Sequence, residues 1–174
     1  MEVKMGWLNE DETCTQSKSS LAFNIMLAAF LYLFITGAEA SELLFNCDSG
    51  NVKYKIFEDD NEIVYSHSKG GVEDMYIQAS KKDAVFKMAS VPLSGGDVAY
   101  IQFSRGDYSY YFYDAITYAR EPPLDALGVM VWRNGVMLSD RTCSGHKNGL
   151  FSEVYQNIPR VKMDENVFDK IIDR

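Results

Sequence analysis

The sequence predicts an all-β fold with about eight antiparallel strands in a sandwich or a small barrel, followed by a short C-terminal helix. Strand-forming residues come in short runs that turn residues separate. Val52, Tyr54 and Ile56 alternate with lysines, as in a strand with one buried face. Asn134-Gly135 stands between two apolar runs and is the strongest short signal for a β-hairpin.

The expected strands follow one another along the chain and end at Cys143. Glycine-rich or charged turns separate most of them. The segment Arg120–Asp125 contains two prolines and is expected to lie outside the strands, because proline cannot donate to a β-ladder. The predicted strands are Val52–Ile56, Ile63–Ser68, Asp74–Ala79, Ala84–Val91, Val98–Phe103, Tyr108–Asp114, Val129–Trp132 and the run that begins at Val136.

Ser104-Arg105-Gly106-Asp107 contains Arg-Gly-Asp, a known cell-adhesion signal. It lies between two predicted strands. Gly106 can supply the positive φ angle of a tight hairpin turn, and aspartate is common in turns. We therefore interpret the motif as a turn.

The strand after this turn is rich in tyrosine and phenylalanine on both of its faces, which predicts a central strand packed on two sides. Tyrosine is also common at binding surfaces, because its side chain is large, rigid and amphipathic. The interpretation we favour is core packing and cross-strand pairing. The candidate binding surface, if one row faces solvent, consists of Tyr108, Tyr110, Tyr111, Tyr113 and Tyr118.

The pattern changes after Cys143. Residues 144–149 are typical of a flexible link, and Asp164–Ile172 has apolar residues at helical spacing, with Asp164 as a candidate N-cap. We predict a short helix that rests on the β-domain or on a partner. The predicted organisation is thus 1–40 as a leader, 41–143 as the β-domain and 144–174 as linker and helix.

The N-terminal region contains an uncharged run, Leu21–Thr36, followed by Ala38-Glu39-Ala40, which is typical of a signal-peptidase site. Residues 1–40 are therefore expected to be a cleaved signal peptide. The alternative is an uncleaved inner-membrane anchor through residues 21–37. The acidic residues before the run are atypical of a leader.

Cys47 and Cys143 are the two cysteines of the expected mature chain. An even pair in an exported protein predicts a disulfide, and the alternative is two free buried thiols.

Composition places the chain among ordinary globular proteins, and its 174 residues predict one domain. The net charge of −8 argues against nucleic-acid binding, which requires a basic surface.

The order of features from Cys47 to Cys143 resembles a group of small exported bacterial proteins, often lipoproteins. The matching residues are Cys47, Ile63-Val64-Tyr65, Phe103–Tyr110, Gly128–Val131, Asn134-Gly135 and Cys143. This resemblance implies an exported β-domain with no assigned activity. The chain departs from the group in lacking a lipobox before Cys47 and in its C-terminal extension. A weaker likeness, at the level of fold alone, is to periplasmic lysozyme inhibitors.

The sequence offers no catalytic set, metal site or cofactor motif. His67 and His146 are the only histidines, and metal sites usually need three or four ligands. Ser144-Gly145-His146 places a serine near a histidine, but proximity along the chain is not triad geometry. The acidic run Glu58–Glu62 lacks the spacing of a calcium loop and is interpreted as a solvated turn.

These observations favour a periplasmic or secreted binding protein without catalytic activity. Its expected partner is a protein or an envelope macromolecule, and inhibition of a cell-wall hydrolase is one form that this function can take. The alternatives are a hydrolase that acts on envelope material and a membrane-anchored structural protein.

Overall fold

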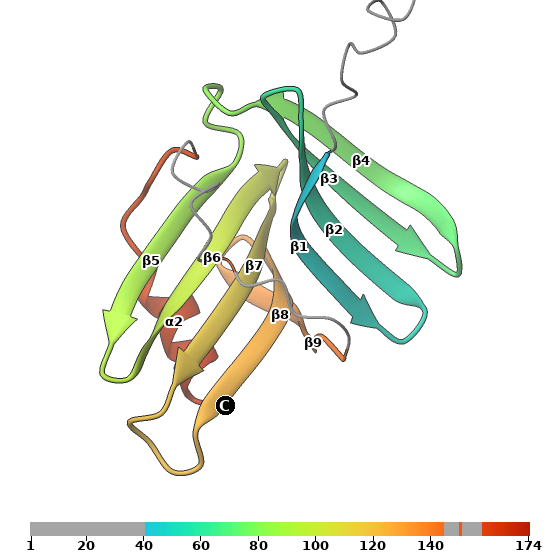
Figure 1. The fold of residues 1–174 in the computed structure, drawn as a ribbon. Coiled ribbons are helices and arrows are strands. Elements are labelled where there is room, and N and C mark those ends of the chain that lie inside the picture. Colours follow the sequence, from blue (N-terminus) through green and yellow to red (C-terminus); the bar gives the residue numbers. More distant parts are fainter. Residues whose placement is uncertain (1–40, 145–149, 151–157) are drawn as a thin grey trace, which may run out of the picture. The chain divides into compact units, whose positions relative to one another are not determined.

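The computed structural model describes residues 41–144, 150 and 158–174. Glu39–Arg174 form one compact unit. Nine strands of the described part form two antiparallel sheets with a sandwich-like arrangement, which confirms the all-β prediction (Figure 1). Sheet 1 contains β1 (Glu42–Ser49), β2 (Val52–Asp59), β3 (Glu62–Lys69) and β4 (Val72–Ser80); sheet 2 contains β5 (Lys87–Leu93), β6 (Gly96–Arg105), β7 (Tyr108–Thr117), β8 (Leu124–Arg133) and β9 (Val136–Thr142).

The structure adds one strand to those predicted, and most of the others extend beyond their predicted ends. The starts of β8 and β5 differ most from the prediction. β1 is the additional strand, and a register shift between Leu43 and Phe45 interrupts the alternation that would have revealed it. β8 begins at Leu124, inside the segment that we expected to lie outside the strands, because Leu124 pairs with Thr117 of β7. β5 begins three residues later than predicted, at Lys87, after Ala84 with its φ of 51°.

Consecutive strands within each sheet are neighbours, so each sheet is a meander of hairpins. Gly106 has a φ of 59° in the β6–β7 turn, as predicted for a tight turn at Arg-Gly-Asp. Asn134 and Gly135 have φ of 50° and 78° in the β8–β9 turn, which is the geometry expected of a type I′ turn.

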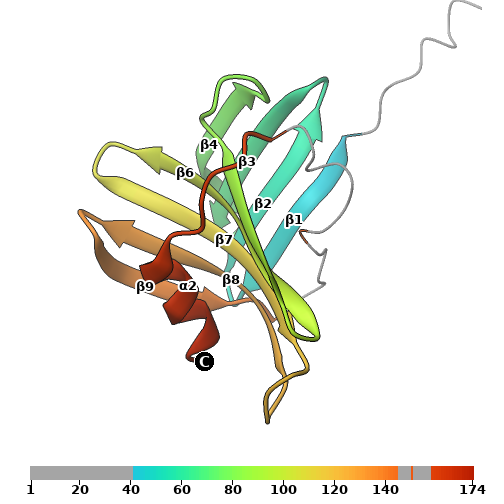
Figure 2. The same ribbon diagram turned by 90° about the vertical axis from the view of Figure 1, so that its left-hand side faces the viewer.

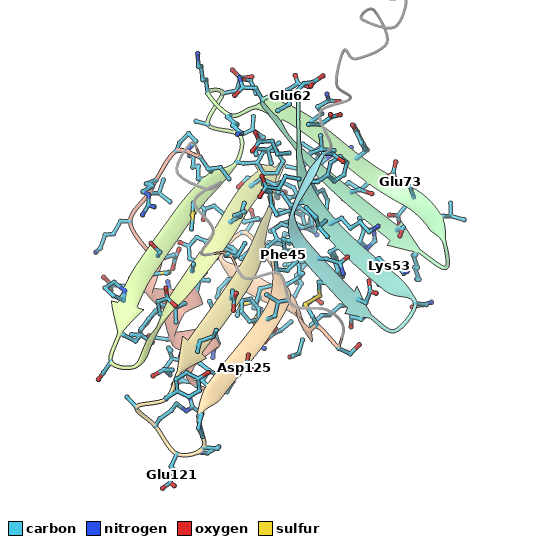
Figure 3. The ribbon with its side chains drawn as sticks, in the orientation of Figure 1. Phe45, Lys53, Glu62, Glu73, Glu121 and Asp125 are labelled. Atoms are coloured by element: carbon cyan, nitrogen blue, oxygen red, sulfur yellow. A yellow bond between two sulfur atoms is a disulfide. The ribbon has the colours of Figure 1, made fainter. Side chains whose placement is uncertain are left out.

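The main core lies between the two sheets and is rich in aromatic side chains (Figure 3). Phe45 of β1 and Tyr65 of β3 project from sheet 1 toward Phe103 and Phe112 of sheet 2. The ring centroids of Phe45 and Phe112 are 5.4 Å apart, and those of Tyr65 and Phe103 are 4.9 Å apart. These distances lie in the range of favourable aromatic pairs, so the two sheets are joined by direct ring packing.

A second core covers the opposite face of sheet 2. The helix α2 (Glu165–Ile172) lies on this face, with Val167 and Ile171 buried against it (Figure 2). Asp164 caps the helix by accepting hydrogen bonds from the N–H groups of Asn166 and Val167, as the sequence predicted. The helix therefore rests on the β-domain, and β7 is packed on both of its faces.

The segment before α2 runs along the outer edge of β5. The N–H of Met88 donates to the carbonyl of Pro159, and the N–H of Val161 donates to the carbonyl of Met88, both at 2.9 Å. Met88 and Arg160 form a parallel bridge. The chain thus covers one edge of sheet 2 with its own backbone.

A disulfide joins Cys47 of β1 to Cys143, just beyond β9, with Cα atoms 4.9 Å apart. Beside it, the N–H of Ser144 donates to the carbonyl of Asp48 at 2.9 Å. The predicted pairing is therefore present, and it ties sheet 1 to the end of sheet 2.

Candidate functional site

The turns of the β6–β7 and β8–β9 hairpins lie side by side at one end of sheet 2 (Figure 2). The N–H of Asn134 donates to the carbonyl of Asp107 at 3.2 Å, which joins the two turns directly. We call this region the hairpin-tip surface and define it by Arg105, Asp107, Tyr108, Arg133 and Asn134.

The charged groups of the hairpin-tip surface are arranged around one aromatic ring. The Arg133 guanidinium lies over the Tyr108 ring, 5.3 Å from its centroid, in cation–π geometry. The same guanidinium is 3.9 Å from the Asp107 carboxylate. Arg105, Asp107 and Arg133 are all exposed. The surface therefore presents two guanidinium groups and a half-buried ring from a chain that is acidic as a whole.

The five tyrosines of the predicted binding surface do not share one face. Tyr108 belongs to the hairpin-tip surface, Tyr110 packs against the core between the sheets, and Tyr111 packs on the face under α2. Tyr113 is completely buried, whereas Tyr118 is 70% exposed in the β7–β8 connection. Ligand binding at these tyrosines stays a prediction, and Tyr108 and Tyr118 are the two that are not packed into either core.

A histidine–carboxylate pair lies on sheet 1. The Nδ1 atom of His67 on β3 is hydrogen-bonded to the carboxylate of Asp74 on β4. The His67 ring also contacts the ring of Tyr54, with centroids 4.9 Å apart. A carboxylate bonded to Nδ1 orients an imidazole so that Nε2 is left to accept a proton, which is a known arrangement for a general base.

The tyrosines near His67 are poorly suited to act as nucleophiles. Burial raises the pKa of Tyr54 above 10.0, although the positive charge of Arg141 opposes the effect. Burial also raises the pKa of Tyr65, by a larger amount. Both phenols are therefore protonated at neutral pH.

The remaining predicted sites have simple structural roles or lie outside the described residues. His146 and the N-terminal segment 1–40 are not among the described residues. Ser144 hydrogen-bonds Asp48 near the disulfide. In the acidic run, Glu58 forms an ion pair with Lys81, whose side chain is almost fully buried. Within the described ranges, no group of three or more His, Cys, Asp or Glu side chains is arranged to hold a metal ion.

Two features of the structure had no counterpart in the sequence analysis. Asp114 is buried on β7, and its carboxylate accepts a 3.1 Å hydrogen bond from the N–H of Leu150. Val136, Met137 and Leu138 are exposed on β9, although their apolar character predicted an ordinary strand. The sequence carried no signal for either, because both depend on which segment lies next to the strand.

In the part of the chain that the structure describes, no helix is long and apolar enough to cross a membrane. No protein-family model, curated protein or solved structure matches this chain.

Proposed function

We propose that this protein is an exported binding protein, without catalytic activity, that docks to an anionic macromolecule of the cell envelope through the hairpin-tip surface. The observation that supports this proposal is the stack of Arg133 on Tyr108 beside exposed Arg105. Arginine and tyrosine are the side chains most often responsible for binding energy at interfaces. Guanidinium groups also bind carboxylates and phosphates in a bidentate manner.

The local charge of the hairpin-tip surface, and not the charge of the whole chain, supports the choice of an anionic partner. The chain has a net charge of −8, so a polyanion is repelled by most of its surface. The hairpin-tip surface carries two arginines against one aspartate, and it therefore offers locally favourable contacts. Such an arrangement directs the partner to one end of sheet 2.

Export is supported by the disulfide, because such bonds persist outside the reducing cytosol. The predicted leader at 1–40 and the resemblance to small exported bacterial proteins favour the same compartment. The N-terminal residue of the mature protein, determined by mass spectrometry, tests this part; Ser41 is expected.

A pull-down with purified envelope fractions tests the binding function. We expect wild-type protein to retain an anionic component, and Tyr108→Ala and Arg133→Ala to weaken retention by about tenfold or more, since loss of a central contact costs at least about 1.4 kcal/mol. Lys53→Ala is the control, because Lys53 is an exposed cation on sheet 1. Equal retention of all variants would exclude the hairpin-tip surface as the binding site.

Inhibition of a cell-wall hydrolase is tested with the same proteins in a lysozyme assay. Inhibition that survives Tyr108→Ala and Arg133→Ala would place the inhibitory contact elsewhere on the molecule. Inhibition that these two variants abolish would identify the partner as an enzyme instead of an anionic polymer.

The second candidate function is hydrolysis of envelope material, and the His67–Asp74 pair is the observation that favours it. Among the described residues, the aromatic ring that contacts His67 is that of Tyr54, and burial raises the pKa of this phenol, so it is protonated at neutral pH. Turnover of cell-wall substrates by wild-type protein, with loss of turnover in His67→Ala, would establish the enzyme and contradict the binding proposal.

A further inference from the structure

Three side chains of the hairpin-tip surface lie in one row across neighbouring strands of sheet 2. Arg105 of β6 pairs with Tyr108 of β7, and Tyr108 pairs with Arg133 of β8 (Figure 2). Directly paired residues of antiparallel strands project their side chains from the same face of the sheet. One aromatic side chain is therefore flanked by an arginine on each side.

The two arginines of this row are held at separate points. Neighbouring strands lie about 4.7–4.9 Å apart, so the backbones that carry Arg105 and Arg133 are separated by ~10 Å. The Arg133 guanidinium lies over the Tyr108 ring. Arg105 acts on the next tyrosine of the same face, because burial raises the pKa of Tyr110 and the positive charge of Arg105 opposes this rise. The row therefore offers two cationic contacts that are set apart along one direction.

Asp107 makes the second arginine important for binding. Its carboxylate is 3.9 Å from the Arg133 guanidinium, which is too long for a hydrogen bond, so this carboxylate does not occupy the N–H groups of Arg133. It still offsets much of the positive charge that an anion would meet there. A ligand with one acidic group at Arg133 thus gains little, whereas a ligand that also reaches Arg105 gains a second charge-assisted contact.

We propose that Arg105 and Arg133 bind two acidic groups of one linear acidic polysaccharide, and that the chain between these groups passes along Tyr108. The inference rests on the proposed function and specifies the partner of the same surface. Guanidinium groups bind carboxylates in a bidentate manner. The Tyr108 hydroxyl and the side-chain amide of exposed Asn134 are uncharged groups that both donate and accept hydrogen bonds, which suits the hydroxyl groups of a sugar.

Isothermal titration calorimetry of the disulfide-bonded full chain with galacturonate and with oligogalacturonates of increasing length tests the proposal. Each sugar unit of these probes carries one carboxylate. We expect affinity to rise by about tenfold or more once an oligomer is long enough to contact both arginines, because the second contact forms within the same complex.

Matched variants connect this rise to the two arginines. Arg105→Ala and Arg133→Ala each remove most of the gain with length, since only one guanidinium of the row is left. Arg160→Ala is the control, because it removes the same single charge from an exposed arginine on the segment beside β5. This variant keeps the gain with length.

Equal wild-type affinity for galacturonate and its oligomers overturns the proposal. A gain with length that survives in Arg105→Ala and Arg133→Ala also overturns it, and so does tighter binding of inorganic polyphosphate chains than of oligogalacturonates. If no oligogalacturonate binds while envelope fractions are still retained through Tyr108 and Arg133, this inference fails and the proposed function stands. If wild-type protein also retains no envelope component, both fail.

Discussion

At the scale of single residues, Gly128 shows how one missing side chain shapes the second core. Gly128 on β8 pairs with Tyr113 on β7. A Cβ atom at position 128 would overlap the ring and hydroxyl of Tyr113 and would lie 2.6 Å from the carbonyl oxygen of Arg141. The Tyr113 side chain therefore occupies the space that a larger residue would need. On the same ring, the Arg174 guanidinium lies 4.4 Å from the centroid.

We predict that Gly128→Ala lowers the free energy of unfolding by about 1–3 kcal/mol, because the added methyl group overpacks this site. Urea denaturation followed by circular dichroism measures the loss. In a Tyr113→Ala background the same substitution costs less, since the ring that it meets is gone. An equal cost in both backgrounds would show that Tyr113 is not the group that excludes the side chain.

At the scale of elements, α2 is attached by more than its apolar face. The Arg120 guanidinium, from the β7–β8 connection, donates to the carbonyls of Ile172 and Arg174. At the other end of the helix, the N–H of Asp164 donates to the Tyr100 hydroxyl at 2.9 Å. Burial raises the pKa of Tyr100 to about 12, so this hydroxyl keeps its proton at neutral pH. Both ends of α2 are thus fixed to sheet 2.

Removal of the Arg120 side chain is expected to loosen α2. Arg120→Ala leaves carbonyls at the helix C-terminus without their charged donor, and we predict a loss of about 1–3 kcal/mol in the free energy of unfolding. Faster hydrogen exchange at residues 165–172 would locate the change. Lys162→Ala is the control, because its ion pair with Glu165 is almost fully exposed and contributes at most about 1 kcal/mol. Similar effects of the two substitutions would contradict this role of Arg120.

At the scale of the whole molecule, the disulfide closes the compact unit over a sequence separation of 96 residues. It lies where sheet 1 meets the chain that leaves β9, and Cys47 is completely buried. The same chain then contributes Leu150 to the core between the sheets and α2 to the second core. The bond therefore connects sheet 1 to the segment that completes both cores.

We predict that replacing both Cys47 and Cys143 by serine lowers the free energy of unfolding by about 4–5 kcal/mol, because a long loop regains its freedom in the unfolded chain. Urea denaturation of the variant and of wild-type protein without reductant measures the difference. Thiol counting on denatured, unreduced wild-type protein gives the independent check. Two reactive thiols per chain would contradict the disulfide and, with it, the strongest support for export.

The sequence by itself determined the features that depend on neighbouring residues. The alternation of Val52, Tyr54 and Ile56 predicted β2. Asn134-Gly135 predicted the turn between β8 and β9, and Asp164 predicted the start of α2. Each of these patterns specifies a backbone conformation within a few residues, which is the range over which turn, cap and pleat preferences act. The disulfide was also predictable, because only two cysteines remain in the expected mature chain.

Only the tertiary structure decided which residues of these elements are covered. Tyr113 is buried and Tyr118 is exposed, although both belong to one tyrosine-rich stretch, because α2 and sheet 1 cover β7 and not the connection that follows it. In the same way, Val136, Met137 and Leu138 of β9 are exposed, whereas the apolar residues Leu127, Val129 and Met130 of the neighbouring β8 are buried. Burial is set by contacts between segments far apart in the chain, and a local pattern contains no information about which segment arrives.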